Sequence, residues 1–381
     1  MELFATSALL KKQFNLSAGT SDFGEGVTST ICTFSSDFDF SPIRPDAPLS
    51  QEELNILTEN GKDGNFTFRY PVFYDSQLKG KNNKAILLLH GLNERSWEKY
   101  LSWAYFLVKH TGRSVIMFPI AFHMNRTPQQ WGNARLMHSL SDYRRRNKNV
   151  QNTSFANLAL SLRMEYTPQM FPISGTQTYF DLVKLCTEIK EGRHELFEAN
   201  TSVNIFAYSI GALLAEILLI ANPASLFSGE RAFLFCGGAS VDKMNPNSKS
   251  IIDSEATRQL NEFLKCNYKV SDLMRIPEQN MPLLPKAWDS FRYLSCGDCC
   301  TRERDLALAG IKGQIKTLGL GFDSVISPRA IEETLHSNFS ILSPRYPGSH
   351  ENPFPFLKDE QGREVEDTFN TIFSEASKFL A

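Results

Sequence analysis

The stretch Ser-Val-Asn-Ile-Phe-Ala-Tyr-Ser-Ile-Gly-Ala-Leu-Leu-Ala, residues 202–215, decides the fold of this chain. Its first half is an apolar segment typical of a strand, and an apolar segment typical of a helix follows Ser209 with no linker between them. The turn is therefore so tight that the positions two before and two after the serine must be small. Ala207 and Gly211 meet that demand. The stretch predicts a strand, a sharp turn at Ser209, and a helix that starts directly after it.

Ala-x-Ser-x-Gly in this setting has the layout of a nucleophile elbow. A serine hydroxyl attacks well only when a base can reach it and the backbone holds it clear of the sheet. The helix N-terminus beneath Ser209 also favours negative charge developing beside it. The ordinary alternative is a strand, turn and helix in which Ser209 merely caps the helix, and the motif alone does not separate the two.

Short apolar runs on either side of this stretch predict the rest of the fold. A strand pair, or a strand broken at Pro71, is expected at residues 66–70 and 72–74. Runs that are apolar on both faces are typical of buried strands in a parallel sheet. Such runs occupy residues 85–89, 115–118, 205–207, 232–236 and, more weakly, 315–320. A last strand is expected at residues 339–342. Helical segments are expected at residues 97–110, 177–189, 211–220, 328–335 and 366–380. The alternation predicts an α/β fold with a doubly wound, mostly parallel sheet.

Two intervals, about 121–175 and about 242–313, are too long to be simple connections. Each begins after the carboxyl end of a predicted strand, which is where open α/β sheets bind ligands. Because structureless loops of such length are uncommon, we expect both to form helical caps. The predicted organisation is one domain over residues 65–381 with these two cap insertions, and an N-terminal extension over residues 1–64 that packs on it.

Four pieces in chain order carry a family resemblance: His90-Gly91 after an apolar strand, the elbow around Ser209, Gly321-Phe322-Asp323 after the strand ending near Leu320, and Gly348-Ser349-His350 after the last strand. On these pieces the chain resembles the α/β-hydrolase fold superfamily over residues 66–381. The order Ser209, Asp323, His350 is the Ser…Asp…His order of that fold. Ala207 in place of a glycine and the two large insertions depart from the family pattern, and they leave the substrate class open.

The resemblance gives each residue a role. His350 takes the proton of Ser209 and returns it to the leaving group, and Asp323 fixes the tautomer of the imidazole. The oxyanion hole is formed by two backbone N–H groups, those of Ile210 and Leu92.

Other residues compete for two of these roles. Asp242 is the rival acid, because it follows the strand ending at Cys236, and we favour Asp323 on its local motif. His123 and His336 are rival bases, and both precede the last predicted strand. His90 is expected to close its own turn and not to act as a base.

The expected function is therefore a serine hydrolase that acts on a carboxylic ester, or on a thioester or amide, through an acyl-enzyme on Ser209. The expected substrate is a small-molecule or lipid-like ester, and no metal or organic cofactor is implied. The alternative is a catalytically silent α/β-hydrolase-like protein that binds a ligand or partner through its caps.

Composition narrows the class of protein. The chain has 381 residues, 42% hydrophobic and 22% charged, which is ordinary for a globular protein. A formal net charge of −2 gives no electrostatic case for a nucleic-acid partner. The basic run Arg144-Arg145-Arg146 is expected to be a solvated helix end or loop and not a binding patch. We expect no membrane-spanning segment, and the N-terminus lacks the pattern of a signal peptide.

The cysteines indicate a compartment. Seven scattered cysteines in a chain of this size favour reduced thiols and a cytoplasmic location. Cys296-Gly297-Asp298-Cys299-Cys300 is a cluster, but a zinc site needs a second pair or nearby histidines, and none follows. The cluster is therefore expected to be a reduced loop without a metal.

Overall fold

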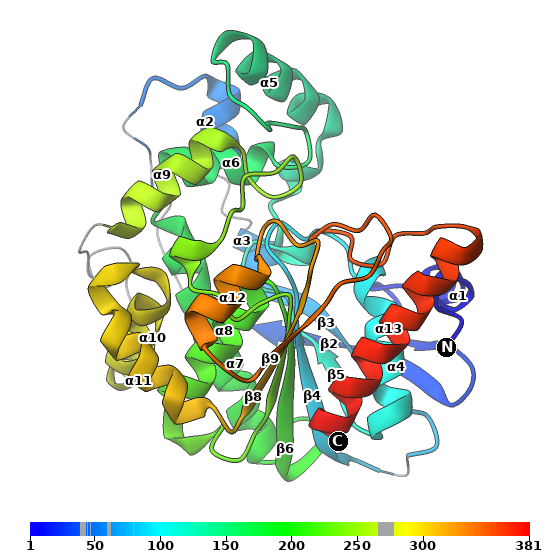
Figure 1. The fold of residues 1–381 in the computed structure, drawn as a ribbon. Helices are drawn as coiled ribbons and strands as arrows, with labels where there is room; N and C mark the ends of the chain where they lie inside the picture. Colours follow the sequence, from blue (N-terminus) through cyan, green and yellow to red (C-terminus); the bar gives the residue numbers. More distant parts are fainter. Residues whose placement is uncertain (39–42, 44, 46, 59–61, 79, 266–277) are drawn as a thin grey trace.

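The structure, a computed structural model, describes residues 1–381 except 39–42, 44, 46, 59–61, 79 and 266–277 (Figure 1). Its centre is a nine-stranded sheet in the order β1-β2-β3-β5-β4-β6-β7-β8-β9. The strands are β1 (Thr20–Asp22), β2 (Val27–Ser35), β3 (Thr67–Asp75), β4 (Asn82–Leu89), β5 (Ser114–Met117), β6 (Phe197–Tyr208), β7 (Ala232–Phe235), β8 (Ile315–Leu320) and β9 (Phe339–Leu342). The six strands from β4 to β9 run parallel, whereas β1, β2 and β3 pair antiparallel and β3 is also antiparallel to β5. The prediction of an α/β fold with a mostly parallel sheet is confirmed.

Helices cover both faces of the sheet (Figure 1). Their bounds are α1 (Leu3–Gln13), α2 (Gln51–Thr58), α3 (Lys62–Phe66), α4 (Glu98–Thr111), α5 (Ala134–Asn147), α6 (Leu158–Tyr166), α7 (Met170–Lys190), α8 (Ile210–Ala221), α9 (Ser254–Lys265), α10 (Leu284–Ser295), α11 (Thr301–Ile311), α12 (Pro328–Leu335) and α13 (Asp359–Leu380). Side chains of β6 alternate between two hydrophobic cores. Phe206 and Tyr208 join the core with α4 and α13, and Ile205 and Ala207 join the core with α7 and α8. This two-sided burial explains why β6 reads as a continuous apolar run.

One strand differs from its prediction. β3 runs without a break from Thr67 to Asp75, and Pro71 pairs with Ile31 inside it. The expected break at Pro71 is wrong. β3 pairs with β5 only at Val72 and Phe73, so over most of its length it has one partner strand, and a proline is tolerated where a ladder hydrogen bond is not required on both sides.

The two long intervals contain helices. Residues 121–175 include the short helix η1 (Met124–Arg126), α5, α6 and the start of α7, and residues 242–313 include α9, α10 and α11. In Figure 1, α5, α6 and α9 lie above the sheet. The side-chain amide of Asn93, just after β4, donates to the backbone carbonyls of Ala156 and Ser250, one from each interval, at 3.0 and 2.7 Å. Both intervals therefore reach the carboxyl end of β4.

A buried ion pair joins the two intervals. Arg144 on α5 donates to both carboxylate oxygens of Asp253, at 2.7 and 3.1 Å, and it also pairs with Glu165. Its side chain is only 2% exposed. The expectation that the basic run is solvated is wrong for Arg144, because two carboxylates draw this guanidinium inward, whereas Arg145 and Arg146 are exposed.

The N-terminal segment is part of the sheet. β1 and β2 form its first edge, and α1 packs against α4 and α13. In the part of the chain that the structure describes, every helix is too short or too polar to cross a membrane.

Candidate active site

Ser209 occupies the turn between β6 and α8 in a backbone conformation that side-chain-bearing residues rarely adopt, with φ 58° and ψ −123°. Such a conformation costs of the order of 1–3 kcal/mol and persists only where the surroundings enforce it. Gly211 is one of the residues that hold Ser209 in this conformation. A Cβ atom added there would lie 2.7 Å from the carbonyl oxygen of Leu89 and 2.9 Å from that of His90. The small residue two positions after the serine is therefore required by the close approach of α8 to the end of β4.

Three side chains expected from the sequence meet at this turn. The Oγ atom of Ser209 lies 2.7 Å from Nε2 of His350, and Nδ1 of His350 lies 2.7 Å from Oδ2 of Asp323. All three residues are buried. Since a carboxylate only accepts, Nδ1 carries the proton and Nε2 presents a lone pair to the serine hydroxyl.

Asp323 and His350 are each held by their own loops. The second carboxylate oxygen of Asp323, Oδ1, accepts hydrogen bonds from the backbone N–H groups of Val325 and Ile326, both at 2.9 Å. The hydroxyl of Tyr208 donates to the carbonyl oxygen of His350. The carboxylate and the imidazole are therefore fixed by backbone groups as well as by each other.

The two residues expected to bind an oxyanion lie beside Ser209. Ile210 is the first residue of α8, and N–H groups in the first turn of a helix have no carbonyl partner within that helix. Leu92 follows the turn at Gly91, whose N–H donates to the hydroxyl of Tyr100 at 3.0 Å. Ser209, Leu92 and Ile210 line one small apolar pocket together.

The rival residues lie in other surroundings. Asp242 has its carboxylate 3.9 Å from the guanidinium of Arg304. His336 is exposed at the end of α12. His90 uses both ring nitrogens within its turn, because Nδ1 lies 2.8 Å from the carbonyl oxygen of Gly91 and Nε2 accepts from the N–H of Ile120 at 2.9 Å. Burial lowers the pKa of His90 well below its ordinary value.

His123, the other rival base, lies away from the hydroxyl of Ser209, whose partner is His350. It lines a separate cavity next to Leu92 and Ile210, together with Tyr179, which the sequence analysis did not single out. The residues that line the cavity are spread from Leu92, after β4, to Phe291 on α10, and no local motif marks them. The sequence patterns also gave no role to Tyr208, although its place directly before the serine could have marked it as a neighbour of the site.

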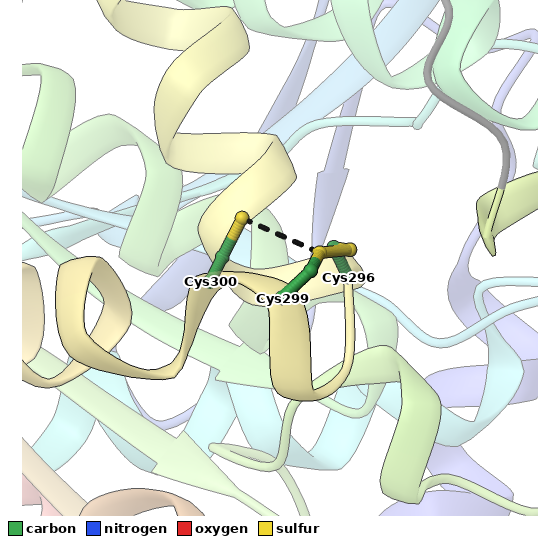
Figure 2. Close-up of side chains that lie close together, drawn as sticks. All are labelled: Cys296, Cys299 and Cys300. Carbon is green, nitrogen blue, oxygen red and sulfur yellow. Dashed lines mark hydrogen bonds between the residues drawn. A yellow bond between two sulfur atoms is a disulfide. The ribbon is translucent and has the colours of Figure 1, made fainter.

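The cysteine cluster differs from its prediction (Figure 2). Cys296 and Cys299 are joined by a disulfide, so the expectation of reduced thiols is wrong for these two. They meet because Cys296 directly follows α10 and the short turn η7 (Asp298–Cys300) leads directly into α11. Sγ of Cys300 lies 3.6 Å from Sγ of Cys299.

These three cysteines are, over the described residues, the group of side chains whose arrangement suits a metal ion. Thiolates are the ligands that soft metal ions prefer, and the disulfide engages two of the three sulfurs. Cys32, Cys186, Cys236 and Cys300 are free and buried, and burial raises the pKa values of Cys32 and Cys186 to about 12. Cys266 lies outside the described residues.

Solved structures similar to this chain include carboxyl esterase 2 of the mycorrhizal fungus Tuber melanosporum, with 10% identity, a TM-score of 0.47, and coverage of 99% of this chain and 98% of that chain. One of two fungal esterases from Rhizomucor miehei has 10% identity, a TM-score of 0.46, and coverage of 99% and 97%. An esterase of Pyrobaculum calidifontis has 9% identity, a TM-score of 0.42, and coverage of 100% and 90%. Likenesses this distant assign no activity or substrate to this chain.

No curated protein matches the sequence. One family model matches residues 31–381, and its description is "Family of unknown function (DUF6051)". Because that match spans most of the chain, the protein belongs to this family, and its fold is of the α/β-hydrolase type.

Proposed function

We propose that the protein is a serine hydrolase that cleaves a carboxylic ester through Ser209, His350 and Asp323. The observation that carries the proposal is the line of two hydrogen bonds, each 2.7 Å long, from Asp323 through His350 to the hydroxyl of Ser209. A nucleophile, a base that reaches it and a group that orients the base are the parts that acyl transfer needs.

In the first half of the reaction, Oγ of Ser209 attacks the carbonyl carbon of the ester while Nε2 of His350 takes its proton. The negative charge that develops on the carbonyl oxygen is bound by the backbone N–H groups of Leu92 and Ile210. The C–O bond of the ester then breaks, His350 gives the proton to the leaving alkoxide, and an acyl-enzyme on Ser209 remains.

In the second half, water takes the place of the alcohol. His350 removes a proton from the water as its oxygen attacks the acyl carbon, and it returns this proton to Oγ of Ser209 when the acid leaves. Asp323 holds the imidazole in the tautomer that both steps require and stabilises the imidazolium between them. Each step uses groups of the chain and water alone.

The helical intervals 121–175 and 242–313 act in this proposal as caps on one domain over residues 65–381. Contacts of both intervals with Asn93, two residues after Gly91, support that arrangement. The described part of residues 1–64 packs on this domain, and β1 and β2 complete its sheet.

Covalent labelling tests the proposal. A fluorophosphonate probe is expected to label the wild type at Ser209, and Ser209→Ala is expected to lose both the labelling and the hydrolysis of p-nitrophenyl esters. Ser250→Ala, at an exposed serine in the second interval, is the matched control and should retain both. A wild type that is folded, is not labelled and hydrolyses none of these esters would refute the proposal and favour a silent, ligand-binding member of the fold.

A further inference from the structure

The turn between α10 and α11 brings together three cysteine sulfurs that the proposed hydrolysis does not use (Figure 2). The Sγ atoms of Cys296, Cys299 and Cys300 all lie within 4.8 Å of one another. Cys300 is buried, whereas Cys296 is half-buried and Cys299 is exposed. The three sulfurs therefore form a compact group that is open to the solvent at Cys299.

The disulfide between Cys296 and Cys299 contributes little as a cross-link. It joins residues only three positions apart, and the stabilisation from a cross-link grows with the length of the segment that it closes. The helices on both sides of it are held in other ways, since α10 and α11 each pack against α8. Because exposed disulfides are the labile ones, this pair is open to reduction by thiols.

In the reduced state, the spacing of the three sulfurs suits a zinc ion. Zinc binds thiolates at about 2.3 Å in tetrahedral geometry, which sets two ligand sulfurs about 3.8 Å apart. Sγ of Cys300 already lies 3.6 Å from Sγ of Cys299, and an open disulfide frees Sγ of Cys296 to take a similar place in the same short turn. Three thiolates fill three of the four positions and water can fill the fourth, so a second cysteine pair is not required.

The surroundings offer positive charge to such a group of thiolates. Cys300 is the N-cap of α11, and N–H groups in the first turn of a helix attract negative charge. Arg304, one turn further along α11, is only 4% exposed, and its Nε and Nη1 atoms have no hydrogen-bond partner. Its guanidinium reaches back to the residue after Cys300, since Nη2 lies 3.5 Å from Oγ1 of Thr301. The carboxylate of Asp242 is 3.9 Å from Nη1, which is too far for a hydrogen bond.

We propose that Cys296, Cys299 and Cys300 bind one zinc ion when they are reduced, and that the disulfide is the metal-free form of the same site. Two molecules of a small thiol reduce the disulfide, leave as their own disulfide, and convert Cys296 and Cys299 to thiols. The three cysteine thiols then release their protons as three Zn–S bonds form, and a water molecule completes the tetrahedron. The site is separate from the proposed triad, so the inference does not rest on hydrolysis by Ser209.

Zinc binding to the full chain tests the inference, with a phosphine as the reductant because it supplies no competing thiol. Competition with a chromogenic chelator measures the stoichiometry and the affinity, and the absorption of the Cd²⁺ complex reports thiolate ligands. The reduced wild type is expected to bind one zinc ion per chain. Oxidation of the protein should release that ion as thiol titration shows the loss of two thiols.

Cys300→Ser is the decisive variant. It should weaken zinc binding by about 100-fold or more, because a hydroxyl replaces a thiolate ligand. The variant should fold, because serine is a favoured N-cap residue and α11 keeps its cap. Cys32→Ser is the matched control and should bind zinc as the wild type does, because this buried thiol lies on β2 and donates to Oε1 of Glu195.

A reduced and folded wild type that binds no zinc would overturn the inference, as would a Cys300→Ser variant that binds zinc as tightly as the wild type. Retention of the ion by the oxidised protein would also overturn it, since the disulfide then engages two of the three ligands. Loss of the folded circular-dichroism spectrum on reduction would show that the disulfide is a structural cross-link, and would refute the inference equally.

Discussion

Asp323→Asn tests the proposed site most sharply, because the structure determines how the introduced amide must be oriented. Oδ1 of Asp323 accepts from the N–H groups of Val325 and Ile326, and Oδ2 accepts from Nδ1 of His350. An amide has one oxygen and one NH2 group to fill these two places. With its oxygen towards His350, the NH2 group would face two N–H donors, and two hydrogen bonds would be lost at about 1–3 kcal/mol each.

The amide therefore keeps its oxygen on the loop and turns its NH2 group towards Nδ1 of His350. Nδ1 must then accept, so the imidazole proton moves to Nε2. The nitrogen that faces Ser209 at 2.7 Å loses the lone pair that takes the serine proton. Loss of the productive tautomer in a triad of this kind costs about 10⁴-fold in kcat, or about 5.4 kcal/mol of barrier. The effect on folding should be small, since the shape of the side chain is retained.

Initial rates of p-nitrophenyl acetate hydrolysis, with circular dichroism to establish folding, measure this effect. Asp242→Asn is the matched control, because Asp242 lies beside Arg304, and it should retain most of the activity. A folded Asp323→Asn variant with more than a tenth of the wild-type rate would contradict the reasoning. So would an Asp242→Asn variant with the larger loss, which would move the acid to the loop after β7.

Three further changes test the framework of the site. Both carboxylate oxygens of Glu216 lack partners, and burial raises its pKa from 4.5 to about 8. Between these pH values the folded state holds a proton that the unfolded chain releases, so the free energy of unfolding should fall by about 1.4 kcal/mol per pH unit as pH rises. Glu216→Gln removes this titration and should flatten the profile of Tm against pH. Gly211→Ala places a Cβ atom too close to the carbonyl oxygen of Leu89. We therefore expect a large loss of soluble protein or of fluorophosphonate labelling. Normal yield and labelling would show that α8 packs less tightly against the end of β4 than described. Arg126→Met removes the guanidinium that lies 2.9 Å from the buried carboxylate of Asp181. Urea unfolding should show that the free energy of unfolding falls by about 3–5 kcal/mol. A decrease below about 1 kcal/mol would mean that water reaches Asp181.

Much of the sheet could be predicted from the sequence because its strands are buried on both faces. β7 and the second half of β4 each appear as a continuous apolar run, β8 is a weaker one, and α12 coincides with its predicted residues. β2 escaped prediction for the opposite reason. Five of its nine residues are serine or threonine, and it lies next to the edge of the sheet, where burial imposes no apolar pattern.

The residues of the proposed triad could be named from the sequence because each follows the end of a strand. In a parallel sheet the strand ends gather at one edge, so Ser209 after β6, Asp323 after β8 and His350 after β9 are brought together by topology alone. Local patterns in the chain are enough to find such positions, even where 141 residues separate Ser209 from His350.

The cavity beside Leu92 and Ile210 could not be predicted in this way, because helix packing and not strand order determines its wall. Trp288 on α10 lines the same space as Tyr179 on α7 and Ile217 on α8 only because these helices pack on one face of the sheet, and nothing in the separate segments indicates which helix faces meet. That Nε2 of His123 has no hydrogen-bond partner is likewise invisible in the sequence, since it depends on which polar groups the neighbouring segments bring close to it. In the proposed hydrolase, the reacting groups and the lining of the cavity therefore depend on contacts of different kinds. A substitution in a cap helix can change the cavity while the strand ends that hold Ser209 and His350 stay in place, and exchange of Trp288 for a smaller residue should accordingly shift the preference among ester substrates while fluorophosphonate labelling of Ser209 persists.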